Sequence, residues 1–122
     1  MKLKILPFDL TVCKLSAIDE INIKSDFFFI GKTENELSLV CKKEETPLQT
    51  TEREDGWRGF FVDGKLDFSL IGILSDISSI LAKEKISIFA LSTYNTDYIL
   101  VKKEQFDSAV CALEKNGYET EY

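Results

Sequence analysis

The sequence of 122 residues contains no histidine. This absence excludes Ser-His-Asp and Cys-His catalysis and removes the commonest metal ligand. Its three cysteines, Cys13, Cys41 and Cys111, form no C-x-x-C pair, so a structural zinc site is not expected. Scattered cysteines in odd number indicate reduced thiols packed as small apolar residues, which predicts a cytoplasmic protein. We therefore expect a protein without catalytic activity, metal or cofactor.

Long apolar runs are also lacking. No run approaches the ~18 residues of a membrane span. Lys2 and Lys4 precede apolar residues, as in a signal peptide, but Pro7 and Asp9 interrupt the run and favour a buried strand. The net charge of −6 disfavours binding to nucleic acid or to an anionic membrane. The hydrophobic content of 44% is sufficient for a folded core.

The apolar periodicity predicts a chain of short strands and two full helices. We expect one strand over 3–15 or two strands broken at Pro7, and then a short helix capped by Ser16 with Ile18 and Ile21 buried. The remaining predicted elements are strands 26–32 and 36–42, an irregular connection 43–56 that includes a short extended piece, strand 57–62, helix 69–84, strands 86–92 and 97–102, helix 104–116 ended by Gly117, and an edge strand within 118–122.

Two hairpins of the chain overlay without a gap at an offset of 60 positions. FIGKTENELSLVCKKE (29–44) and FALSTYNTDYILVKKE (89–104) share six identical residues, including the turn residues Thr33/Thr93 and Asn35/Asn95. Two unrelated hairpins of similar composition are the alternative, but identities in register favour a duplicated unit.

The predicted order over 57–122 is βαββαβ, the ferredoxin-like arrangement of an α+β domain. Residues 1–56 form a partial, degenerate copy that shares one compact structure with it. Strands 57–62 and 86–92 are apolar on both sides, whereas the helices of such a fold cover only one. We therefore expect the other half of the chain or a second chain on the other side. In a homodimer or higher oligomer, that face includes Trp57, Phe61, Phe89 and Leu91.

Polar residues gather at two ends that the element order brings close together. These are the opening of helix 69–84 and the turn Ser92–Asp97. Gly72, in the first helical turn, is explained equally by close approach of a ligand or by tight helix–sheet packing. Asp97 is explained either as a turn residue or as a carboxylate that faces a ligand amine. Thr93 and Asn95 have the same two explanations.

The stretch LDFSLIGILSDISSILAKEKISIFALSTYNTDYILVKKEQFDSAVCALEKNGY resembles the ACT domain, a ferredoxin-like module that senses small metabolites. The resemblance is to small tandem-ACT proteins related to aspartate kinase regulatory domains and to the cytosolic arginine sensor. It implies allosteric binding of an amino acid at an interface between ACT units. By carry-over of the motif, the ligand contacts are Ser69, Ile71, Gly72, Ser92, Thr93, Asn95, Thr96 and Asp97. No enzyme domain is attached, so the regulated partner is open.

Two hypotheses follow. The first is a regulatory ACT protein that binds an amino acid and dimerises, with a partial unit in 1–56 and an ACT domain in 57–122. The alternative is a structural or protein-interaction ACT module that has lost ligand binding. A pocket with converging polar groups between the helix opening and the turn discriminates between them.

Overall fold

The computed structural model describes residues 1–63 and 72–122 and divides the chain into two compact units. The first unit comprises Phe8–Trp57, and the second unit comprises Met1–Pro7 together with the described part of Arg58–Tyr122. The sequence argument assigned Met1–Pro7 to the first half of the chain. The structure places these residues in the second unit, because strand β1 (Lys2–Ile5) pairs with strands of that unit.

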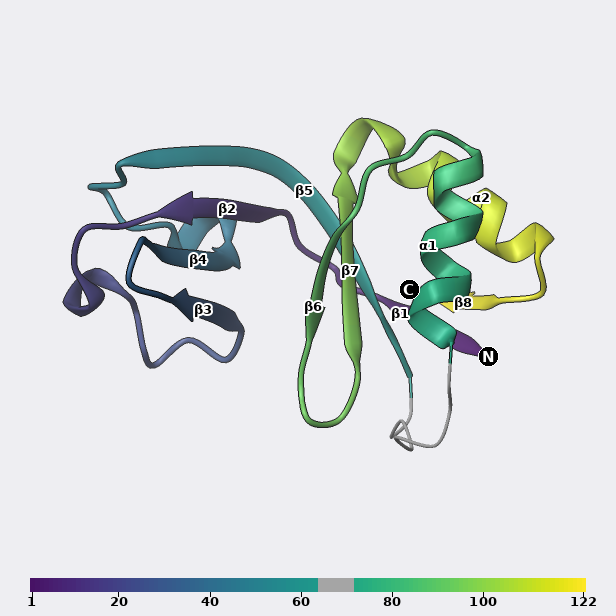
Figure 1. The fold of residues 1–122 in the computed structure, drawn as a ribbon, viewed down its shortest axis with the longest axis horizontal. Helices are drawn as coiled ribbons and strands as arrows, with labels where there is room; N and C mark the ends of the chain where they lie inside the picture. The colour runs from purple at the N-terminus through teal and green to yellow at the C-terminus, as the bar shows by residue number, and fades with distance from the viewer. Residues whose placement is uncertain (64–71) are drawn as a thin grey trace. The chain divides into compact units, whose positions relative to one another are not determined.

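The second unit is a mixed sheet with two helices (Figure 1). Its strands lie in the order β6-β7-β5-β1-β8, in which β1 is antiparallel to β5 and parallel to β8. The chain order β5-α1-β6-β7-α2-β8 confirms the predicted βαββαβ unit. Besides β1, its elements are β5 (Glu52–Val62, which begins in the first unit), α1 (Ile73–Lys83), β6 (Phe89–Ser92), β7 (Asp97–Lys102), the 3-10 turn η3 (Lys103–Gln105), α2 (Phe106–Lys115) and β8 (Glu119–Glu121).

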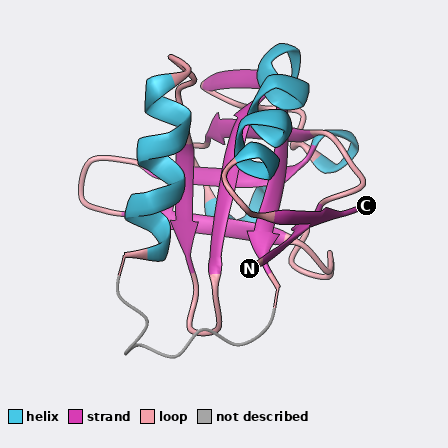
Figure 2. Cartoon of the chain, turned by 90° about the vertical axis from the view of Figure 1, so that its right-hand side faces the viewer, coloured by secondary structure: helices cyan, strands magenta, loops and turns pink. Residues whose placement is uncertain are grey.

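Both helices of the second unit lie on one side of its sheet (Figure 2). α1 contributes Ile77 and Leu81 to the core and α2 contributes Leu113, all fully buried. These residues follow the three- and four-residue spacing of one helix face. Phe60 and Ile99 of the sheet are equally buried in the same core. Burial of these side chains holds the helical layer on the sheet.

The first unit has strands in the order β3-β4-β2-β5 and no α-helix among its residues. These four strands correspond to β6, β7, β5 and β8 of the second unit, in which β1 is inserted as an additional strand between β5 and β8. Its core consists of buried apolar residues from β2, from the segment that follows β2 and from β4: Cys13, Leu15, Ile21, Leu37, Leu39 and Cys41, with the partly buried Phe28 of β3 packed against them. The elements are β2 (Leu10–Lys14), the 3-10 turn η1 (Ile18–Glu20), β3 (Phe28–Lys32), β4 (Leu37–Lys42), the 3-10 turn η2 (Lys43–Glu45) and the beginning of β5.

The predicted repeat is present in the backbone. β4 and η2 correspond to β7 and η3 at the offset of 60 positions. The two copies diverge at the next residue, where Thr46 is extended (φ −65°, ψ 131°) and Phe106 is helical (φ −63°, ψ −46°). Pro47 explains the difference, because the residue before a proline disfavours the helical region. A single proline therefore replaces the second helix of the first unit with an irregular segment.

One local prediction was wrong. Ser16 does not cap η1, whose N-cap is Ala17, and Ile18 is 56% exposed rather than buried. The extended piece expected within 43–56 is the beginning of β5, which starts at Glu52 and pairs there with Lys14 of β2. Polar residues 52–56 occupy an exposed strand, which hydrophobic periodicity does not reveal. The break of the first strand at Pro7 and the buried side of 36–42 are confirmed.

Candidate functional site

The turn between β6 and β7 is built from its own polar groups. The Thr93 N–H donates to the Thr96 carbonyl oxygen at 2.8 Å, and the Thr96 N–H donates to Thr93 Oγ1 at 3.2 Å. Ser92 Oγ donates to Asp97 Oδ1 at 2.6 Å across the end of the hairpin. Asn95 is exposed and Asp97 is half-buried. The turn is therefore ordered internally, while Asn95 and Asp97 remain accessible.

Thr96 connects this turn to the rest of the second unit. Its side chain is buried, and its Oγ1 donates to the Val62 carbonyl oxygen at the end of β5 with a distance of 2.8 Å. The turn thus lies at the end of the sheet where β5 finishes, and α1 begins at that same end (Figure 1). The structure places the predicted turn residues and the described start of the helix at one end of the second unit.

The side chain of Asp97 belongs to the face of the sheet that carries the helices. Along a strand, alternate residues share a face. Ile99 and Val101 are buried in the core beneath α1 and α2, so Asp97 lies on their side. Ser92 is its direct neighbour on β6 and shares that side. The pair of polar residues therefore ends the helix-covered face, near the level at which α1 starts.

Comparison with the repeated hairpin of the first unit shows which polar residues of the β6–β7 turn recur in both copies and which are present in the second unit alone. There the Thr33 N–H donates to the Glu36 carbonyl oxygen at 2.9 Å, and Thr33 Oγ1 accepts hydrogen bonds from the Asn35 and Glu36 N–H groups. In both turns the threonine Oγ1 accepts backbone N–H hydrogen bonds, so Thr33 and Thr93 have the same structural role. In contrast, the paired residues that correspond to Ser92 and Asp97 are Lys32 and the buried Leu37. The fold accepts an apolar residue at this position, so it does not require the carboxylate of Asp97.

Gly72 is the N-cap of α1 rather than a residue of its first turn. It has φ +90°, a left-handed conformation that glycine adopts without steric cost. A Cβ added at Gly72 meets no described atom within 4 Å, so tight helix–sheet packing does not explain the glycine. The residue is exposed, and no side chain caps α1 there. The first N–H groups of α1 are therefore not satisfied by Gly72.

Two of the predicted contacts, Ser69 and Ile71, lie outside the described residues. Sequence reasoning missed Asp76, an acidic residue in the first turn of α1. The Tyr118 hydroxyl donates to Asp76 Oδ2 at 2.5 Å, and burial followed by this hydrogen bond raises the pKa of Tyr118. Asp76 is therefore engaged by a neighbouring side chain. The sequence signal for Asp76 is an acidic residue in the first turn of a predicted helix, where the helix dipole stabilises a negative charge.

Clusters of metal-binding side chains and membrane-spanning helices were sought in the part of the chain that the structure describes. Residues 1–63 and 72–122 contain no group of three or more acidic or cysteine side chains placed to hold a metal ion. Neither described helix has the length and apolarity that crossing a bilayer requires. The polar groups at the β6–β7 turn and at the start of α1 are hydrogen-bonding and charged groups suited to holding a small polar molecule.

Comparison with known proteins identifies the chain. The fold is an α+β ferredoxin-like pair of units, of the kind found in regulatory modules that bind small molecules. The family profile described as "ACT domain" matches residues 52–115, just over half of the sequence. The chain therefore belongs to the ACT domain family. No curated protein matches it significantly.

Solved structures agree with this assignment. The crystal structure of protein Atu0741 from Agobacterium tumefaciens is 30% identical, with a TM-score of 0.86, covering 98% of this chain and 91% of that one. The regulatory subunit of aspartate kinase from Thermus thermophilus is 8% identical, with a TM-score of 0.64 and coverages of 93% and 95%. The alpha and beta subunits of an aspartokinase are 14% identical, with a TM-score of 0.67 and coverages of 94% and 96%. The last two share the fold.

Proposed function

We propose that this protein is a regulatory module that binds an amino acid at the β6–β7 turn and the start of α1. The observation that carries the proposal is the polar pair Ser92–Asp97, which replaces the Lys32–Leu37 pair of the repeated hairpin. A residue that the fold does not require, on the helix-covered face and half-buried, is a candidate for recognition. Membership of the ACT domain family supports the same location.

The chemistry of the two ends suits an α-amino acid. The first N–H groups of α1, which Gly72 does not cap with a side chain, and the positive end of the helix dipole favour a carboxylate. Asp97 provides the opposite charge for the ammonium group or a basic side chain, and Asn95 adds a donor and an acceptor. In this proposal Thr93 and Thr96 hold the turn, Ser92 orients Asp97, and Gly72 leaves the approach open. The proposal extends to Ser69 and Ile71 through the family motif alone.

We also propose that the protein acts as a dimer or higher oligomer. The face of the second unit's sheet opposite α1 and α2 carries Phe61 and Tyr98, whose ring centroids lie 5.1 Å apart, together with Phe89 and Leu91. All four side chains are half-buried in the single chain. A half-exposed apolar face of this kind is suited to a second copy.

The alternative is an interaction module that has lost its ligand. One observation favours it: the polar groups of the turn already satisfy one another, since Thr93 bonds to Thr96 and Ser92 bonds to Asp97. A purely structural turn has this arrangement. The alternative predicts that no amino acid binds the second unit.

The experiment is calorimetric titration of the common L-amino acids into the protein and into Asp97→Leu, which copies the residue of the first hairpin. Asn35→Ala, in the corresponding turn of the first unit, is the control variant. We expect one or a few amino acids to bind, and Asp97→Leu to weaken their affinity tenfold or more, because a charge-assisted hydrogen bond contributes about 1.5–3 kcal/mol. Equal affinity of Asp97→Leu and the natural protein would remove Asp97 from the site. Absence of binding by every amino acid would favour the interaction module.

A further inference from the structure

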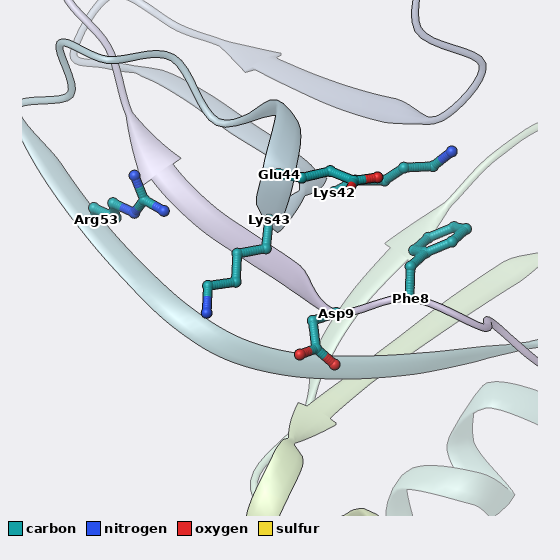
Figure 3. A pocket seen from close by; sticks show the side chains of 6 residues that line it. All are labelled: Phe8, Asp9, Lys42, Lys43, Glu44 and Arg53. Carbon is teal, nitrogen blue, oxygen red and sulfur yellow. The ribbon is translucent and has the colours of Figure 1, made fainter.

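We propose that the first unit carries a second binding site, separate from the β6–β7 turn, for a zwitterionic amino acid. Within this unit lies a cavity of about 390 Å³ lined by Phe8, Asp9, Lys42, Lys43, Glu44 and Arg53 (Figure 3). Its volume falls in the range of small-molecule sites, about 300–1,000 Å³. The lining residues come from the segment before β2, the end of β4, the turn η2 and the strand β5.

The backbone around the cavity is fixed by strand ends. The Lys43 N–H donates to the Asp9 carbonyl oxygen at 3.0 Å, which joins η2 to the beginning of β2. β2 pairs with β4 on one side and with β5 on the other, so Arg53 lies on the strand next to this junction. The charged side chains therefore extend from a hydrogen-bonded framework, and their spacing does not depend on a loose loop.

Two of the three cations already have partners, but in different ways. Lys42 Nζ lies 2.9 Å from Asp26 Oδ1 and 4.7 Å from the centre of the Phe8 ring, so its charge is compensated. Among residues 1–63 and 72–122, Arg53 has Asp55 as its partner, and its Nε donates to Asp55 Oδ1 at 2.9 Å. This bond fixes the guanidinium plane while its two terminal nitrogens remain as a fork for a carboxylate.

Lys43 is the third cation of the lining, and its charge acts on the nearby Asp55 carboxylate, whose pKa it helps to lower. Among the residues that the structure describes, its ammonium group has no hydrogen-bond or ion-pair partner, and its side chain points toward the carboxylate of Asp9 and the side of the cavity where Arg53 lies (Figure 3). Lys43 and the terminal nitrogens of Arg53 thus provide two positively charged donors at one cavity. Two such donors together are what a carboxylate group binds.

The acidic lining decides between an anion and a zwitterion. Asp9 and Glu44 also border the cavity, so a ligand with two negative charges would meet like charges. A ligand with one carboxylate and one ammonium group places opposite charges against both sets of residues. The Phe8 ring supplies an apolar wall for the side chain of such a ligand.

The duplication explains why the cavity belongs to the first unit. The tripeptide Lys42-Lys43-Glu44 recurs as residues 102–104, where the chain continues directly into α2. In the first unit Pro47 ends the turn after residue 45, and no described helix follows. Lys43 and Glu44 therefore border a cavity instead of preceding a helix.

This inference does not depend on ligand binding at Asp97, and the test separates the two sites. The measurement is titration of the ¹⁵N-labelled full chain with each common L-amino acid at millimolar concentration, followed by amide chemical shifts. Binding in the cavity shifts the amides of Asp9, Lys43, Glu44 and Arg53, whereas binding at the turn shifts those of residues 92–97. The desamino analogue of each amino acid that binds, which retains the carboxylate alone, tests the need for the ammonium group.

Three variants complete the test. Lys43→Gln removes the ammonium group, and Arg53→Lys keeps the charge but removes the fork; each should weaken binding in the cavity about tenfold or more. Lys32→Gln removes one positive charge at the end of β3, beside the start of β4 and away from Lys42, and should leave the affinity unchanged. Equal affinity of Lys43→Gln and the natural protein, an equally strong shift with the desamino analogue, or no shift of the cavity amides by any amino acid would overturn the proposal.

Discussion

Exchange of residues between the two repeated hairpins gives the sharpest test of the role of Asp97. Asp97→Leu places in the second unit the residue that the first unit has at the same position, and Leu37→Asp does the reverse. The two substitutions exchange the same pair of residue types, in opposite directions, at equivalent strand positions. Any difference in their effect on stability therefore reports the surroundings.

The expected magnitudes follow from burial. Asp97→Leu loses the hydrogen bond from Ser92, which is exposed, and we take about 1.5 kcal/mol for it, the lower end of the range for charged groups. A half-buried leucine returns about 1 kcal/mol, roughly half the value for full burial. The free energy of unfolding should therefore change by less than about 1 kcal/mol. Leu37 is 9% exposed within the core of the first unit. Leu37→Asp loses its burial and desolvates a carboxylate, at a cost of about 3–5 kcal/mol.

The assay is urea unfolding followed by circular dichroism, with the slope of the transition compared among the variants. We expect Leu37→Asp to lower the midpoint strongly and Asp97→Leu to leave it almost unchanged. A loss of more than about 2 kcal/mol in Asp97→Leu, beyond an ordinary surface substitution, would show that the carboxylate is structural. That result would refute the reasoning from the repeat.

Further predictions concern the core, the thiols, the pH dependence and the oligomer. Ile77→Ala should cost about 2–5 kcal/mol in urea unfolding, because Ile77 is fully buried in the core of the second unit, and a loss below about 0.5 kcal/mol would contradict the assigned helix face. A thiol reagent at about pH 8 should label Cys111 rapidly and Cys13 slowly, since burial raises the pKa of Cys13 to about 11; fast labelling of both would contradict this. Hydrogen bonds from Arg53 and then Thr11 lower the pKa of Asp55. Their stabilisation is therefore complete above the unfolded pKa of about 4 and is lost as the pH falls through the lower folded value, so Asp55→Asn should reduce the loss of stability in acid. Light scattering should give at least twice the mass of 13.9 kDa, and a monomer at micromolar concentration would count against the proposed oligomer.

The sequence by itself determined the elements whose signals are local. Helical spacing placed Ile77 and Leu81 on one buried stripe, and the offset of 60 positions identified two hairpins that the structure shows to be equivalent. Such predictions succeed because periodic burial and turn formation depend on residues that are close together in the sequence. The βαββαβ order followed from these elements, and family membership followed from the same stretch of sequence.

The tertiary structure decided features that depend on residues far apart in the chain. The sequence did not reveal that β1 inserts between β5 and β8, because strand pairing is non-local. It left Asp97 with two explanations, and the register of the repeated hairpin supplies Lys32 and Leu37 as the pair to compare with Ser92 and Asp97. The cavity beside Lys43 was also hidden, since its lining comes from segments up to 45 positions apart, from Phe8 to Arg53. The interaction energy of two charged side chains depends on their distance in space, which only the folded structure determines.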